Sequence, residues 1–190
     1  MYLPEVYVGL GGNIGDSCTI LEWAIEKIAL LPGVYNITVS RFYYTTPVSS
    51  IPQDPYINAV CYFKTSDSAH TLLKQLQDIE KSLGKVEKLK EAPRIIDIDI
   101  LFYGVETFNE VDLQIPHPRW SERLFVVAPL ADLTAHVFIP DAKNPKTIAH
   151  FDVRKYLQNF PNIHQEVVTP MRNLCRQYDS KNSPLARVSR

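Results

Sequence analysis

The stretch IIDIDILFY, residues 95–103, alternates isoleucine with aspartate and predicts a β-strand. Side chains alternate across the two faces of a β-strand, so Asp97 and Asp99 share one face and the isoleucines share the other. The isoleucine face predicts packing against a hydrophobic core. Aspartate is a poor strand former, so using it twice in a strong strand suggests a functional role. A bare pair of this kind is otherwise typical of a solvated strand face.

The hydrophobic periodicity on both sides of this strand predicts a series of elements. They are a strand at 6–10, a helix ending near 31, strands at 37–44 and 56–65, a helix at 68–83, a hairpin partner at 105–108 and a helical stretch at 121–133. A proline-rich loop is expected at 45–55. The order strand–helix–strand–strand–helix–strand predicts an α+β ferredoxin-like sandwich, an antiparallel sheet with helices on one face.

Length and composition predict one domain at 1–162, large enough to bury a hydrophobic core, followed by a basic C-terminal tail at 163–190. The tail is either a solvated segment or a linker to a fused partner. A formal net charge of −1 gives no basic field, so neither nucleic acid nor membrane is an expected partner. Three scattered cysteines predict neither a disulfide framework nor a zinc site. With no signal-peptide pattern, we expect a cytoplasmic protein, and a monomer.

The two aspartates suit a hard divalent cation. Their backbones stand about 7 Å apart in a strand, and their carboxylates can converge on one or two ions. Magnesium prefers oxygen ligands and often takes one or two carboxylates together with substrate phosphates. Arg94 lies three residues before Asp97, and its guanidinium suits a phosphate. These residues predict binding of Mg-ATP and transfer of a phosphate-containing group to a small acceptor.

The run from Lys90 to Leu101 resembles the signature of the 6-hydroxymethyl-7,8-dihydropterin pyrophosphokinases of folate biosynthesis. That signature is a basic residue, small residues, Arg, and then Asp-aliphatic-Asp before further aliphatics. The resemblance extends over about Val6 to Pro140. It includes Gly11–Asp16, Phe42–Pro47, Tyr56–Ala59, Glu80, Pro116-His117, Arg123 and Phe125. Several spaced motifs in the right order are more specific than any one of them.

The resemblance implies that ATP gives its β,γ-pyrophosphoryl group to the hydroxymethyl oxygen of a reduced pterin, and that AMP leaves. Asp97 and Asp99 would hold two magnesium ions, and Arg94 and Arg123 would clamp phosphate oxygens as catalytic residues. The residues implied at the nucleotide are Gln77, Glu80, Lys85, Arg94, Ile100, His117 and Arg123.

The resemblance also implies a pterin pocket. Tyr56 and Phe125 would stack on the ring, and Asn58 would bind its polar edge. The other residues implied there are Gly11, Thr45, Thr46 and Val48. The glycine segment at 9–15 lacks the endings of a P-loop and of a dinucleotide-binding motif, so we do not interpret it as a phosphate cradle.

The loop at 85–91 departs from the family pattern. Glu87 and Glu91 are acidic where relatives carry other residues, so Lys85, Lys88 and Lys90 are the candidates for binding triphosphate. This departure leaves open a catalytically degenerate module that binds pterin or nucleotide without turnover. A non-catalytic ferredoxin-like binding module is a further alternative, although the aromatic motif of RNA-binding versions is absent from the sequence.

Overall fold

The computed structural model describes residues 3–49, 52–86, 92–140, 147–161 and 165–171. Its main sheet is antiparallel and follows the order β10-β3-β4-β1-β5, with β2 also paired to β4. These strands are β1 (Glu5–Gly12), β2 (Val34–Val39), β3 (Tyr43–Thr45), β4 (Tyr56–Thr65), β5 (Asp97–Tyr103) and β10 (Val168–Pro170). Taken in chain order, β1 to β5 follow the predicted ferredoxin-like plan.

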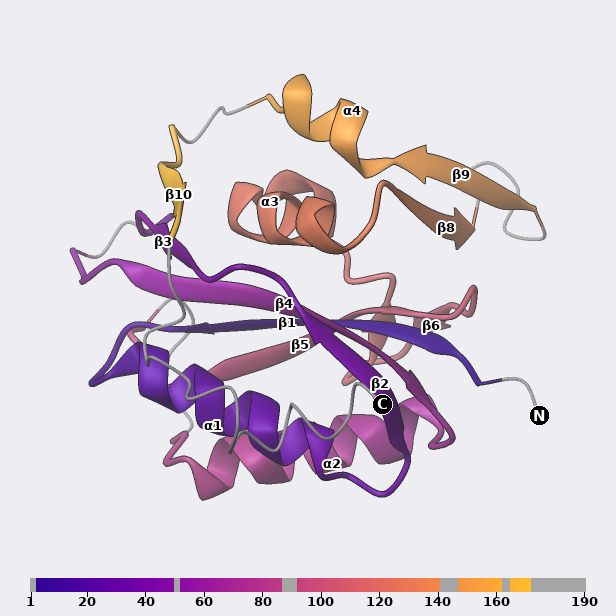
Figure 1. The fold of residues 1–190 in the computed structure, drawn as a ribbon, viewed down its shortest axis with the longest axis horizontal. Coiled ribbons are helices and arrows are strands. Elements are labelled where there is room, and N and C mark those ends of the chain that lie inside the picture. Colours follow the sequence, from indigo (N-terminus) through magenta and orange to yellow (C-terminus); the bar gives the residue numbers. More distant parts are fainter. Residues whose placement is uncertain (1–2, 50–51, 87–91, 141–146, 162–164, 172–190) are drawn as a thin grey trace.

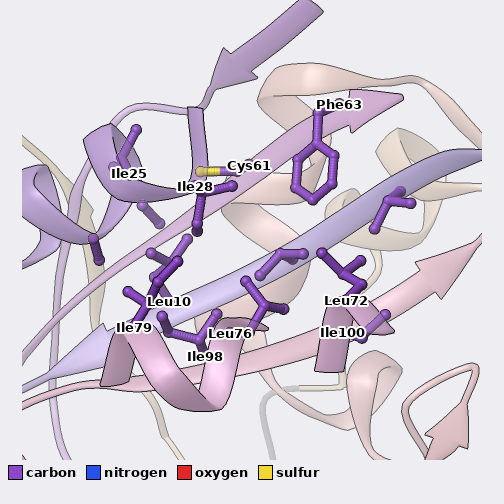
Figure 2. Close-up of a cluster of buried hydrophobic side chains, with 14 of the residues drawn as sticks. Leu10, Ile25, Ile28, Cys61, Phe63, Leu72, Leu76, Ile79, Ile98 and Ile100 are labelled. Carbon is purple, nitrogen blue, oxygen red and sulfur yellow. The ribbon is translucent and has the colours of Figure 1, made fainter. Parts of the chain in front are cut away.

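Two helices cover one face of the sheet, α1 (Ser17–Ala29) and α2 (Ala69–Ser82) (Figure 1). Each helix begins at a side-chain cap, because Asp16 accepts from the Thr19 backbone N–H at 3.1 Å and Ser68 accepts from that of Thr71 at 3.2 Å. Ile98 and Ile100 of β5 pack into this layer beside Leu72, Leu76 and Ile79 (Figure 2). The isoleucine face of the alternating stretch therefore lies in the core, as predicted.

The opposite face of the sheet is also covered, which the prediction of helices on one face did not include. A short 3-10 turn, η1 (Trp120–Glu122), leads into α3 (Leu124–Leu133), which packs over β4 (Figure 1). Beyond α3 lie the hairpin strands β8 (His136–Pro140) and β9 (Ile148–Asp152), and then α4 (Val153–Gln158). The buried side chains of α3 form a second core with Val60 and Leu101. This layer places Arg123 and Phe125 above the sheet.

Two predicted strands differ from the observed ones. The strand expected at 37–44 is divided into β2 and β3, because Ser40 turns inward and its hydroxyl accepts the Val60 backbone N–H at 3.0 Å. The hairpin partner expected at 105–108 is wrong. The backbone turns at Gly104, and β6 (Phe108–Asn109) pairs instead with β7 (Gln114–Ile115).

Segment 165–171 adds to the sheet. The strand β10 pairs with β3, and the Met171 backbone N–H donates to the Phe42 carbonyl at 2.7 Å. The folded unit therefore continues past the predicted boundary at residue 162. The remainder of the predicted tail, 172–190, lies outside the described residues.

The cysteines and the helices bear on two other expectations. Cys61 is buried and free. Among the described residues, no helix has both the length and the apolar character needed to cross a bilayer.

Candidate active site

A cavity of about 390 Å³ opens at one end of the sheet, beneath α3. It is bounded by the ends of β1 and β3, the starts of β4 and β5, and the segment from His117 to Val126. Twelve of the predicted site residues line it. These are Gly11, Thr45, Thr46, Val48, Tyr56, Asn58, Arg94, Asp97, Asp99, His117, Arg123 and Phe125. The predicted nucleotide and pterin residues thus meet in one cavity. We call Arg94, Asp97, Asp99, His117 and Arg123 its charged end, and the seven predicted pterin residues its neutral end.

Asp97 is paired with two cationic side chains. Lys85 Nζ lies 2.7 Å from Asp97 Oδ1, and Arg94 Nη1 lies 2.5 Å from Asp97 Oδ2. Burial alone would raise the pKa of Asp97, but the hydrogen bonds and charges of Lys85 and Arg94 outweigh it and hold the pKa below its usual value. Both of its oxygens therefore already face positive charge.

Asp99 lies in a different electrostatic environment on the same strand face. Its Oδ2 is 3.8 Å from both His117 Nε2 and Arg123 Nη1, which is beyond hydrogen-bonding distance. Burial in the pocket, together with the neighbouring charge of Asp97, raises the pKa of Asp99 to about 6. Asp99 is therefore less compensated by positive charge than Asp97.

His117 is held in one orientation by the backbone. The backbone N–H of His117 donates to the Leu101 carbonyl at 2.9 Å, and the ring Nδ1 accepts the Arg119 backbone N–H at 3.2 Å. Since Nδ1 accepts, the proton of the neutral ring belongs on Nε2, which faces Asp99. Burial and the charges of Arg123 and Arg119 lower the pKa of His117 to about 4. The ring is therefore a neutral donor near neutral pH.

The neutral end of the cavity is organised by Asn58 and Thr45. Both are buried, and Asn58 Nδ2 donates to Thr45 Oγ1 at 2.7 Å. Gly11 pairs with Asn58 on one side and with Asp97 on the other, and a side chain at this position would collide with the Asn58 amide oxygen. Glycine at position 11 therefore keeps the Asn58 amide oriented into the pocket.

Two aromatic residues enclose this neutral end. The Tyr56 hydroxyl donates to Gln53 Oε1 at 2.9 Å, and burial raises its pKa. The guanidinium carbon of Arg123 lies 5.5 Å from the centroid of the Phe125 ring, a cation–π distance. The arrangement offers ring faces and one amide to a flat polar heterocycle.

The paired aspartates fit a magnesium ion. They present oxygen donors to the same cavity, and Asp97 already binds the cationic side chains of Lys85 and Arg94. Over the described ranges, no group of three or more His, Cys, Asp or Glu side chains gathers into a closed metal site. Magnesium usually keeps several waters or substrate oxygens beyond one or two carboxylates, so the donor set suits it.

Four predicted nucleotide residues lie outside the lining of the cavity. Gln77 is exposed on α2, and the Ile100 side chain packs in the helix-side core. Glu80 is buried and contacts Lys85, and Lys85 reaches the site only through Asp97. The other predicted loop residues lie outside the described residues, namely Glu87, Lys88, Lys90 and Glu91.

The structure adds residues that the sequence did not identify. Asn13 joins two loops. Its Oδ1 accepts the Arg94 backbone N–H before β5 at 2.9 Å, and its Nδ2 donates to the Asp54 carbonyl before β4 at 2.9 Å. Its place inside the glycine-rich turn was the available signal. Glu166 also lines the cavity, and it comes from the segment predicted as tail, where no local pattern marked it.

Known structures first define the fold class. Wild-type HPPK-DHPS of Plasmodium falciparum superposes with a TM-score of 0.57 at 15% identity, over 84% of this chain and 45% of that one. At this identity the likeness concerns the fold alone, and it confirms the ferredoxin-like α+β class.

Sequence relatives then define the family. The family model for 7,8-dihydro-6-hydroxymethylpterin-pyrophosphokinase (HPPK) matches residues 7–135. The folic acid synthesis protein fol1 of Pneumocystis carinii is 41% identical over 135 residues, which are 71% of this chain and 18% of that protein. The 2-amino-4-hydroxy-6-hydroxymethyldihydropteridine pyrophosphokinase of Methylorubrum extorquens is 35% identical over 150 residues, 79% of this chain and 95% of that protein. The chain belongs to the HPPK family, and the enzyme class predicted from its sequence is confirmed.

Proposed function

We propose that this chain transfers pyrophosphate from ATP to 6-hydroxymethyl-7,8-dihydropterin, giving AMP and the pterin diphosphate. One observation carries the proposal. A single cavity is lined by the two strand carboxylates and the Arg94 and Arg123 guanidiniums together with the Asn58 amide and the Tyr56 and Phe125 rings. The first group suits a metal-bound polyphosphate and the second suits a flat polar ring. Membership of the HPPK family gives the same reaction.

The charged end would bind the triphosphate. Asp97 and Asp99 would hold two magnesium ions, which neutralise phosphate charge when bound. Arg94 would exchange its contact with Asp97 for phosphate oxygens, and Arg123 would bind the oxygens near Asp99. His117 would donate from Nε2 to a phosphate oxygen, because the Arg119 N–H holds its Nδ1 as an acceptor. Such transfers depend on positioning and charge neutralisation.

The neutral end would bind the pterin. Tyr56 and Phe125 would hold the ring between their faces, and the Asn58 amide would read its donor and acceptor edge. The remaining members of the pocket would be Gly11, Thr45, Thr46 and Val48. The hydroxymethyl group would then point along the cavity towards Asp97 and Asp99.

Identification of the nucleotide product tests this proposal. The protein is incubated with Mg-ATP and the hydroxymethyl dihydropterin, and the products are separated by chromatography. AMP with pterin diphosphate is the expected result. ADP would indicate an ordinary kinase and contradict the proposal. Tight binding of both ligands without turnover would favour the alternative of a catalytically degenerate binding module.

We propose a cytoplasmic monomer whose partners are small molecules, not nucleic acid or membrane, and whose chain beyond the described fold is a basic linker or tail. Fusion to another folate-pathway enzyme agrees with the match to 18% of the fungal fol1 protein and with the bifunctional FolKE of Lactococcus lactis, which is 36% identical over 136 residues. Sedimentation velocity of the purified chain would test the oligomeric state.

A further inference from the structure

Glu80 is a buried carboxylate directly behind the two aspartates. It lies near the C-terminus of α2, and only 4% of the residue is exposed. The resemblance implied that it contacts the nucleotide. In the structure it lies outside the lining of the cavity and faces β5. Its role therefore has to be inferred from what it touches.

The first contact is with the backbone of β5. Glu80 Oε1 accepts the Ile98 backbone N–H at 2.6 Å. Ile98 stands between Asp97 and Asp99, and β5 pairs with β1 at the end of the strand order. The N–H groups on the outer side of such a strand need a partner from elsewhere. Glu80 supplies that partner at the residue that separates the two carboxylates.

The second contact is with Lys85. The same oxygen, Glu80 Oε1, lies 2.7 Å from Lys85 Nζ, and Lys85 Nζ lies 2.7 Å from Asp97 Oδ1. Glu80 thus holds both the backbone of the aspartate pair and the cation that neutralises Asp97. A buried carboxylate with two charge-assisted partners is a rigid support, because moving it would leave charge unpaired.

From these contacts we infer that Glu80 is a positioning residue that sets the placement of Asp97 and Asp99 for divalent cations without touching the nucleotide. The inference rests on the proposed magnesium role of the two aspartates. It predicts that changes at Glu80 act on metal affinity first. It also predicts that Asp78, exposed on the same helix, has no such effect.

The experiment compares Glu80→Ala, Glu80→Gln and the control Asp78→Ala. Mn²⁺ binding is measured by electron paramagnetic resonance in the presence of α,β-methylene-ATP, whose bridging carbon prevents transfer. Glu80→Ala should weaken Mn²⁺ binding about tenfold, the low end for residues that support metal ligands. Glu80→Gln keeps an oxygen acceptor for Ile98 and should weaken it less. Asp78→Ala should match the parent protein.

Two results would overturn the inference. Unchanged Mn²⁺ affinity in both Glu80 variants would show that the carboxylate does not support the metal ligands. Loss of analogue binding in Glu80→Ala at saturating Mn²⁺, with Asp78→Ala unchanged, would make Glu80 a nucleotide contact. If Glu80→Ala fails to fold by circular dichroism, the Glu80→Gln value decides alone, and parent-like Mn²⁺ affinity there contradicts the inference. Because the analogue cannot react, failure of the proposed transferase activity would appear separately, in the AMP assay.

Discussion

The two ends of the cavity are built by different physical means. At the charged end, Asp97 is paired with Lys85 and Arg94, so both of its carboxylate oxygens already have partners that a metal ion or a phosphate must displace. At the neutral end, the hydrogen bond between Asn58 and Thr45 is buried, and neither residue carries a charge. The neutral end is therefore preorganised by this hydrogen bond, whereas the charged end would exchange ion pairs for metal and phosphate. Four predictions test this contrast.

The largest effect is expected at the charged end. Asp97→Ala or Asp99→Ala should lower the rate of AMP formation by roughly 10²–10³-fold or more, because each removes a group that neutralises phosphate charge. AMP formation at saturating substrates measures this effect. Circular dichroism should show an intact fold, since both side chains line the cavity and neither packs in the core. Full activity in either variant would remove the metal role.

A smaller effect is expected at the neutral end. Asn58→Ala should raise the KM for the pterin about 10–100-fold, because it removes a buried hydrogen-bonding group. The Mg²⁺ and ATP dependence should stay as in the parent protein. Thr45→Ser is the control, since it keeps the hydroxyl that Asn58 contacts. An Asn58→Ala variant whose KM for ATP rises as much as that for pterin would contradict the separation of the two ends.

Salt should affect the two ends differently. Raising KCl from about 50 to 500 mM should increase the KM for ATP severalfold, about 3–10-fold, because added ions screen the charges of Arg94 and Arg123. The KM for the pterin should change less than about twofold, because the predicted pterin residues Asn58, Thr45 and Tyr56 carry no formal charge. Steady-state kinetics at a series of KCl concentrations, with MgCl₂ held constant, measures both. Equal salt dependence would mean that charge also governs the neutral end.

The smallest effect concerns stability without metal. The folded pKa of Asp99 is about 6 and lies above its unfolded value of about 3.9, so the folded state binds more protons between these values and stability falls as pH rises. Asp99→Asn should therefore raise the Tm at pH 7 by about 1–2 °C, a small gain because the carboxylate is partly exposed.

The same variant should lose this advantage near pH 4, where Asp99 is largely protonated in the parent fold. Asp97→Asn is the matched comparison and should lower the Tm at pH 7, since the pKa of Asp97 is held below normal by the ion pairs of Lys85 and Arg94. Thermal denaturation in EDTA at both pH values measures the two variants. A lower Tm for Asp99→Asn at pH 7 would contradict the assigned environment.

Local patterns were enough to predict much of this molecule. The two-residue period of β5 predicted which face carries Asp97 and Asp99, and β4 occupies the predicted range, Tyr56–Thr65. The helical spacing of 68–83 predicted α2, because its apolar stripe packs on the sheet. These successes share one cause, since periodicity reports which side chains are buried.

Long-range contacts explain what the sequence did not predict. The break between β2 and β3 depends on a Ser40 contact with Val60, twenty residues away, while the composition of 37–44 stays strand-like. The strand β10 is short and pairs with β3 more than a hundred residues earlier. The resemblance implied that Gln77 and Glu80 both contact the nucleotide, but packing buries only Glu80, against β5.

The strand β10 protects one edge of the folded sheet. It covers the outer edge of β3, with the Thr46 N–H donating to the Val167 carbonyl at 3.0 Å. Open edges of sheets pair readily with other chains and promote aggregation. A chain shortened to residue 162 would expose that edge and also lose Glu166 from the cavity wall. A minimal version of the enzyme should therefore keep the chain through at least Met171.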